Sequence, residues 1–170
     1  MRPQDVVILL KKITPDGRNM SGKQLAESLS ISPSEISEAA DRNLLAGLLD
    51  AKKERVNVLA LKDFLIYGIR YCFPAYLGPV VRGIPTAVSA SPIKDKILSG
   101  SDTYVWPDKS GSFRGQSVEP LYHTVPQAVA IAPKLYELLV ITDTLRMGKV
   151  RERDIAISEL DKYLNAYAAG

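Results

Sequence analysis

Residues that build catalytic and metal sites are scarce in this chain of 170 residues. It has one cysteine, Cys72, and one histidine, His123, and these two lie far apart in the sequence. A single thiol cannot form an intrachain disulfide, and one Cys with one His cannot supply the ligands of a typical zinc site. The chain also lacks a Gly-rich phosphate loop and the GxSxG and HExxH motifs. We therefore expect a protein that is not an enzyme and that needs no cofactor or metal.

A long apolar run and a strong excess of one charge are also missing. The apolar stretch Val6 to Leu10 is too short to span a membrane and lacks the layout of a signal peptide. Lys and Arg number 22 against 19 Asp and Glu, so a nucleic-acid-binding surface would require local clustering of cations. With 46% hydrophobic residues and one cysteine, the composition predicts a cytoplasmic globular protein without a membrane anchor.

The most informative stretch, residues 21–49, predicts two short helices joined by a tight turn. Ser21 and Gln24 have the spacing of a capping box at the start of the first helix. The segment SPSE, residues 32–35, repeats this signal for the second helix and places proline at its first position. Only residues 29–31 remain for the connection, which predicts a steep crossing of the two helices, as in a helix-turn-helix.

The segment LAESLSISPSEISEAADRNLLAGLL resembles the helix-turn-helix of MarR-type winged-helix regulators. It shares their LA pair, a turn ending in Ser, and a final Leu followed by Gly-Leu. The resemblance implies a DNA-binding winged helix, with a recognition helix from Pro33 to Leu45 in the major groove. The sequence departs from the family at Ser30, where the turn often has Gly, and at Glu38 and Asp41, which put negative charge on the reading face. More loosely, the layout resembles winged-helix antitoxins, which implies autoregulation and a toxin partner.

Cations cluster directly after this motif. The segment from Leu48 to Leu61 predicts a small hairpin with three basic residues at its tip, placed to bind the DNA backbone. Two alternatives stay open: a solvated turn whose charges serve only solubility, and a helix that begins at Asn57 and shortens the second strand. The predicted DNA contacts are Lys23, Ser32, Ser34, Ser37, Arg42, Lys52, Lys53 and Arg55.

Outside the motif, apolar periodicity predicts mostly helices. The apolar pattern predicts a first helix from Arg2 to Ile13. It predicts another helix from the spacing of Leu61, Leu65 and Ile69, and we expect Pro74 to end it. The aromatic residues at the end of that helix predict either pairing with a second copy or core packing. Those aromatic residues are Tyr67, Tyr71 and Phe73.

The second half of the chain predicts a β-hairpin and two helices. The hairpin is expected within residues 102–121, around a turn at Gly111. Residues 128–147 predict a helix that Pro133 either breaks or reopens, and residues 150–168 predict the last helix.

The expected fold class is mainly α with a small β component (α+β). We expect a winged helix-turn-helix domain over residues 1–75 and a connecting segment over residues 76–101, with one helical turn near residues 92–98. A C-terminal α+β domain over residues 102–170 would serve dimerisation or the binding of a partner or ligand.

These patterns predict a sequence-specific transcriptional regulator that binds double-stranded DNA as a homodimer. The main alternative is a protein-binding winged-helix adaptor that does not bind DNA, which Glu38 and Asp41 favour. A third class, a ligand sensor, rests on Trp106, Tyr104 and Arg82.

Overall fold

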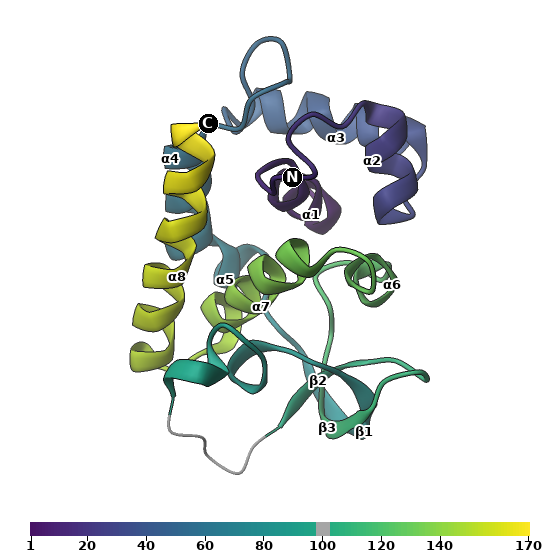
Figure 1. The fold of residues 1–170 in the computed structure, drawn as a ribbon, viewed down its shortest axis with the longest axis vertical. Coiled ribbons are helices and arrows are strands. Elements are labelled where there is room, and N and C mark those ends of the chain that lie inside the picture. Colours follow the sequence, from purple (N-terminus) through teal and green to yellow (C-terminus); the bar gives the residue numbers. More distant parts are fainter. Residues whose placement is uncertain (98–102) are drawn as a thin grey trace.

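The computed structural model describes residues 1–97 and 103–170 and has mixed α and β structure, as expected. Figure 1 shows α3 at one end of the molecule, the three strands at the opposite end, and α7 between them. The last helix, α8 (Val150–Ala169), runs along one side from the strand end towards the α3 end. Among the described residues, no helix has both the length and the apolar character needed to cross a membrane.

The first three helices are α1 (Pro3–Lys12), α2 (Gly22–Leu29) and α3 (Pro33–Leu45), which confirms their predicted positions. The capping box of α2 is complete. The Ser21 hydroxyl accepts from the Gln24 backbone N–H at 3.3 Å, and the Ser21 N–H donates to Gln24 Oε1 at 2.8 Å. Between α2 and α3, Ser30 adopts the left-handed conformation with φ of 53°, so the turn forms without glycine.

The second capping box forms only in part. The Ser32 hydroxyl accepts from the Glu35 N–H at 3.2 Å, and Pro33 occupies the first turn of α3, as predicted. The Glu35 carboxylate, however, accepts from Gln4 at 3.0 Å and from Arg2 at 3.2 Å instead of closing the box. Glu35 therefore joins α3 to α1, and the prediction that it caps its own helix is wrong.

Residues 48–57 form a tight loop closed by a single antiparallel bridge between Leu49 and Val56. The Asp50 carboxylate accepts from the backbone N–H groups of Glu54 (2.8 Å) and Arg55 (3.1 Å). The backbone N–H of Arg55, then that of Glu54, lower the pKa of Asp50. Asn57 caps the next helix by accepting from the Ala60 N–H at 3.2 Å. The predicted hairpin is therefore reduced to one bridge. The alternative prediction, in which a helix begins at Asn57 and shortens the second strand, is confirmed.

That helix consists of α4 (Val58–Asp63), a π-helical turn over Phe64–Gly68, and α5 (Ile69–Cys72). It ends just before Pro74, as predicted. Phe73 is half-buried and contacts the Phe64 ring edge-on, with 6.4 Å between ring centroids. Tyr67 and Tyr71 are instead exposed, so core packing is the wrong prediction for these two rings.

The three strands are β1 (Leu77–Pro85), β2 (Tyr104–Pro107) and β3 (Phe113–Val118), which close into a small barrel. β1 is antiparallel to both other strands, whereas β2 and β3 are parallel to each other. The strands predicted in residues 102–121 are correct, but their pairing as a hairpin is wrong.

The segment predicted as a connection, residues 76–101, contains β1, so its interpretation as irregular structure is wrong. Its glycines and prolines, which hid the strand pattern, have other roles here. A Cβ atom at Gly83 would lie 1.9 Å from the Trp106 carbonyl oxygen, so close strand approach requires glycine. The register with β3 shifts between Leu77 and Val80, next to Pro79. Two short 3-10 turns follow, Ala87–Ser89 and Lys94–Lys96; the second confirms the helical turn predicted near residues 92–98.

After the barrel come α6 (Val125–Val129), α7 (Pro133–Met147) and α8, and Pro133 opens α7 as one alternative predicted. Buried hydrophobic residues from α1 to α8 form one continuous core. The predicted domains 1–75 and 102–170 therefore pack on each other, and their separate functions stay a prediction.

A buried polar cluster lies between α7 and the barrel. The Asp143 carboxylate accepts from Trp106 Nε1 (2.7 Å), Thr86 Oγ1 (2.7 Å) and the Arg146 guanidinium (2.6 Å). Arg146 also donates to the carbonyls of three residues outside α7, which are Phe73, Pro74 and Glu119. Trp106 is 1% exposed, so it anchors the packing and is not available to stack on a ligand.

We predict that Arg146→Met destabilises the protein by about 3–5 kcal/mol, because it leaves the buried Asp143 carboxylate without its cation. Urea unfolding followed by circular dichroism measures this. Lys134→Met is the control, because Lys134 forms an exposed pair with Glu137 at 3.1 Å and should cost no more than about 1 kcal/mol. Equal losses for the two variants would contradict this role of Arg146.

Candidate nucleic-acid interface

The α2–α3 unit, the 48–57 loop and the end of α8 surround a groove of about 940 Å³. Figure 1 shows these parts together at one end of the molecule, with the C-terminal end of α8 beside the loop. Polar residues on its rim come from α2, α3 and the loop, and include Ser21, Ser37, Lys53 and Arg55. Its larger aliphatic lining residues are Ile8, Met20, Leu25, Ile36, Leu49, Val56 and Val58.

Six predicted contact residues are exposed at this end of the molecule: Lys23, Ser32, Ser34, Ser37, Lys52 and Arg55. Lys23 lies in the first turn of α2, and Ser34 and Ser37 lie in the N-terminal half of α3. Lys52 and Arg55 form no ion pair within residues 1–97 and 103–170. Both cations are therefore free to bind an external anion.

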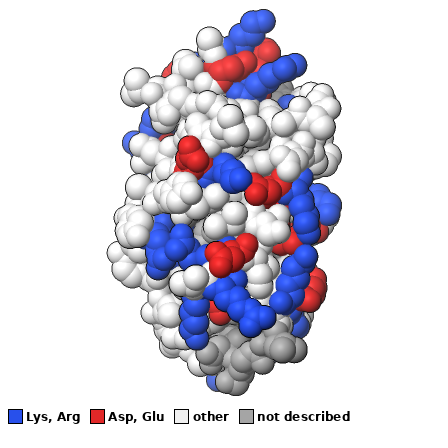
Figure 2. All heavy atoms as spheres, turned by 90° about the vertical axis from the view of Figure 1, so that its left-hand side faces the viewer, with Lys and Arg blue, Asp and Glu red and all other residues white. Residues whose placement is uncertain are grey.

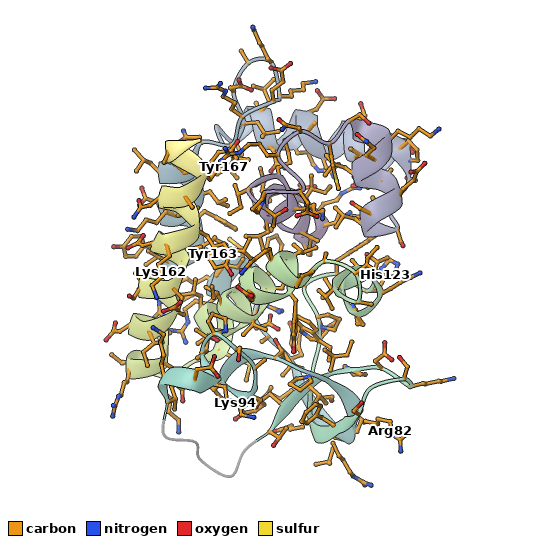
Figure 3. The ribbon with its side chains drawn as sticks, viewed as in Figure 1. Arg82, Lys94, His123, Lys162, Tyr163 and Tyr167 are labelled. Atoms are coloured by element: carbon orange, nitrogen blue, oxygen red, sulfur yellow. The ribbon has the colours of Figure 1, made fainter. Side chains whose placement is uncertain are left out.

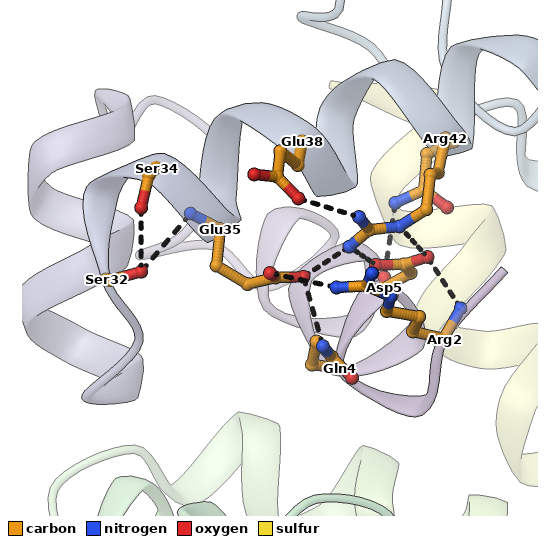
Figure 4. Close-up of polar contacts among 9 residues, drawn as sticks. Arg2, Gln4, Asp5, Ser32, Ser34, Glu35, Glu38 and Arg42 are labelled. Carbon is orange, nitrogen blue, oxygen red and sulfur yellow. Dashed lines mark hydrogen bonds and ion pairs between the residues drawn. The ribbon is translucent and has the colours of Figure 1, made fainter.

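Ser32 and Ser34 are linked to each other at the start of α3. Their hydroxyl oxygens are 3.1 Å apart, and the Ser32 oxygen also caps the helix (Figure 4). The hydroxyl of Ser32 is thus engaged in capping. An anion at this helix start would meet the unpaired backbone N–H groups of the first turn.

Arg42 does not lie on the free face of α3 with the serines. Figure 4 shows its guanidinium turned towards α1, where it donates to the two carboxylate oxygens of Asp5 at 2.9 and 2.7 Å. It also contacts Glu35, and it reaches Glu38 at 3.5 Å. Its hydrogen bonds to the carboxylates of Asp5 and then Glu35 outweigh desolvation and raise the pKa of Arg42 above its usual range. The structure thus assigns Arg42 to a clamp between α1 and α3, in contrast to its predicted role as a DNA contact.

The other acidic residues near α3 also have cations beside them. Burial favours the neutral form of Glu35, but hydrogen bonds from Arg42 and Gln4 outweigh it and lower the pKa of Glu35. Asp41 forms an ion pair with Lys53, which ties the loop to α3 and engages one of the three predicted loop cations. The negative charge on α3 is therefore partly compensated by cations of the protein itself.

The contribution of α8 to the groove could not be predicted from the sequence. The Val56 backbone N–H donates to the Tyr167 hydroxyl at 3.0 Å, and the Arg18 guanidinium lies 4.4 Å from the centre of the Tyr167 ring. Figure 3 shows Tyr167 at the end of α8, beside the 48–57 loop. These contacts join residues more than 100 positions apart, so no local pattern could predict them.

Other sequence candidates lie away from this groove. Figure 3 shows Arg82 on the barrel and His123 beside α6. Arg82 is exposed and Trp106 is buried, so the structure does not bring them to one ligand site. Cys72 is exposed at the end of α5, also away from the groove.

The side of the molecule formed by α8 carries charges of both signs. Figure 2 shows Lys and Arg side chains interspersed with Asp and Glu over this side. Several of them are paired: Lys62 with Asp161 at 2.6 Å, and Lys96 and Lys162 with Glu159 at 2.7 Å. This mixed surface is a poorer candidate for nucleic-acid binding than the end of the molecule that holds the groove.

Comparison of the chain with known protein families, with curated proteins and with solved structures finds no match.

We predict that Arg42→Met lowers the free energy of unfolding by about 3 kcal/mol or more, because Asp5 is fully buried and would lose its cation. The matched control is Arg55→Met in the exposed loop, which should change stability by less than about 0.5 kcal/mol. Denaturant titration of both variants checks this. A stable Arg42→Met protein that binds DNA less well would restore Arg42 as a DNA contact.

Proposed function

We propose that this protein is a sequence-specific, MarR-like transcriptional regulator that binds duplex DNA through a winged helix-turn-helix. One observation carries the proposal. Three elements lie around one groove. They are the N-terminal half of α3 with its serines, the start of α2, and the 48–57 loop with the unpaired cations Lys52 and Arg55. These are the three elements with which a winged helix holds DNA: a helix for the major groove, a helix start for phosphate, and a basic loop.

In this proposal, the N-terminal half of α3 enters the major groove. Ser34 and Ser37 are short, exposed and able to donate and accept hydrogen bonds at base edges. Lys23 and the free backbone N–H groups at the start of α2 bind phosphates. Lys52 and Arg55 bind the backbone on the other side of the groove and supply affinity that does not depend on sequence.

The acidic residues on α3 support the rival proposal, a protein-binding adaptor. Glu38 and Asp41 are exposed, with 60% and 63% of their side-chain surface accessible, and DNA phosphates would repel them. Their ion pairs with Arg42 and Lys53 reduce this repulsion. We therefore favour DNA binding. A cytoplasmic location, autoregulation and a toxin partner stay predictions.

We test the proposal by titrating the protein against the DNA upstream of its own gene and against random duplex DNA over a range of salt concentrations. We expect tighter binding to the upstream fragment and a steep loss of affinity with salt. Replacing Lys52 and Arg55 together by Ala should reduce the slope of log affinity against log salt by about 2.

The matched control replaces Lys94 and Lys109 by Ala, because both are exposed cations outside the lining of the groove and their loss removes the same charge. Its salt slope should equal that of the wild type. Weak and equal binding of the wild-type protein to both DNAs would contradict the proposal and favour the adaptor.

We further propose that the regulator is a homodimer that pairs through the helix of residues 58–72. Leu59, Tyr67 and Tyr71 are 74%, 71% and 77% exposed on this helix, so their side chains are available to pack against a second copy. A dimer also fits the two half-sites that helix-turn-helix proteins commonly bind.

Replacing Tyr67 and Tyr71 by Ser should convert the dimer into a monomer, because burial of these rings would supply the association energy. Sedimentation equilibrium measures this, with Tyr76→Ser as the control for an exposed tyrosine outside the helix. A wild-type protein that is monomeric at micromolar concentration would contradict this proposal.

A further inference from the structure

Two arginines lie directly opposite each other on the outer face of the barrel. Arg82 on β1 is the register partner of Arg114 on β3, so both side chains leave the sheet on the same side, with Cβ atoms about 5 Å apart. Both are exposed, and neither forms an ion pair or a side-chain hydrogen bond in residues 1–97 and 103–170. Like charges at opposite positions of a strand pair repel each other, and a bound anion would remove this repulsion.

The barrel holds Arg82 and Arg114, from here on the arginine pair, in fixed positions. The next residue along each strand is a glycine that allows close approach of a neighbouring strand. A Cβ atom at Gly83 would lie 1.9 Å from the Trp106 carbonyl oxygen, and one at Gly115 would lie 2.4 Å from the Thr103 carbonyl oxygen. The backbone under the arginine pair is therefore tightly constrained, so a ligand that binds there has little backbone to order.

Helix α7 covers one part of the outer face of the barrel and leaves the arginine pair open. On the covered part, Trp106 packs edge-on against Tyr136 of α7, with 5.8 Å between ring centroids. On the open part, Val80 lies opposite Gln116 on the same face as Arg82, and both are exposed. Figure 3 shows Arg82 on the barrel, at the end of the molecule opposite α3.

The turn between β2 and β3 places a third cation beside the arginine pair. The Asp108 backbone N–H donates to the Arg82 carbonyl at 3.1 Å, which brings this turn and its exposed Lys109 next to Arg82. Asp108 is the one acidic residue in segments 77–85 and 104–118. Its carboxylate accepts from the Ser110 backbone N–H at 2.7 Å and forms no ion pair within the described part of the chain. The local charge is therefore positive.

An aromatic ring lies at the rim of this face. Phe113 opens β3 directly before Arg114 and is 51% exposed. Its register partner Gly83 has no side chain that could cover the ring. Arginines beside an exposed ring suit a single strand of nucleic acid, because the guanidinium matches phosphate oxygens and unpaired bases stack on aromatic rings. Duplex DNA offers no such base face, since its bases are stacked inside the helix.

We propose that this face of the barrel binds a single strand of nucleic acid, with a backbone phosphate between the arginine pair and an unstacked base on Phe113. A protein segment is the weaker candidate, because peptides are commonly captured as an added strand at a free sheet edge. The three described strands close into a barrel without such an edge. Figure 1 shows the barrel at the opposite end from α3, so this site is separate from the groove and does not rest on the proposed function.

Fluorescence anisotropy with labelled strands of about twelve thymidines or uridines tests the site without duplex DNA. The wild-type protein should bind at least one strand with an affinity that falls with salt, and a preference for uridines would show that 2′-hydroxyls contribute. Replacing Arg82 and Arg114 together by Gln should weaken binding about tenfold or more.

The matched control replaces Lys94 and Arg151 together by Gln. Both are exposed and lie outside the three strands and the turn between β2 and β3, so the same charge is lost elsewhere. This variant should bind the strand like the wild type, and circular dichroism checks that both double variants are folded. Failure of the wild type to bind either strand, or equal losses in the two double variants, would overturn the proposal.

Phe113→Ser separates stacking from charge. It should weaken binding of the strand that the wild type prefers about fivefold or more, with little change for an abasic strand of the same length. Wild-type affinity of Phe113→Ser for both strands would overturn the stacking role of this ring. A labelled oligoglutamate of the same length tests the protein alternative. If it binds more tightly than both strands and depends on the arginine pair, an acidic protein is the partner and the proposal is overturned.

Upstream duplex DNA distinguishes this inference from the proposed function. If both are correct, unlabelled duplex does not displace the strand, and replacing Lys52 and Arg55 by Ala weakens binding of the duplex but not of the strand. Displacement of the strand by the duplex would overturn the separate site. Strand binding that depends on the arginine pair, in a protein that does not prefer the upstream duplex, would contradict the proposed function and support this inference.

Discussion

The buried ion pair between Asp143 and Arg146 is the interaction on which the arrangement of the two ends of this molecule depends. Through Asp143, α7 holds the end of β1 at Thr86 and the side chain of Trp106 on β2. Through Arg146, the same turn of α7 holds the chain after α5 at Phe73. Each partner compensates a charge that would otherwise be buried alone, so removal of either disrupts the contacts of the other.

The position of the groove follows from this centre. Beyond Gly148 the chain reverses into α8, which runs beside α4 with an ion pair between Lys62 and Asp161. At its end, Tyr167 accepts the backbone N–H of Val56 and so supports the loop that carries Lys52 and Arg55. The proposed DNA-binding loop is therefore held by the C-terminal half of the chain as well as by α3.

Local signals predicted local structure well, because caps and turns are decided within four or five residues. The Ser21–Gln24 box and Pro33 at the start of α3 are examples. Strand β1 could not be predicted in this way, because glycines and prolines are typical of loops. Here they instead allow close approach of two strands and lie beside a shift in strand register. In the site, the exposure of Ser34 and Ser37 followed from helix periodicity, whereas the role of Arg42 did not. Its buried partner Asp5 is 37 residues away, and only the packing of α1 on α3 brings them together.

Amide hydrogen exchange with and without the upstream DNA duplex tests the central claim most directly, because it reports where DNA lies on the protein. DNA binding at the groove end predicts slower exchange at the start of α2, in the N-terminal half of α3 and in the 48–57 loop, with no change in β1, β2 and β3. Unchanged exchange in those three segments at saturating DNA, or slower exchange confined to the barrel, would contradict the account.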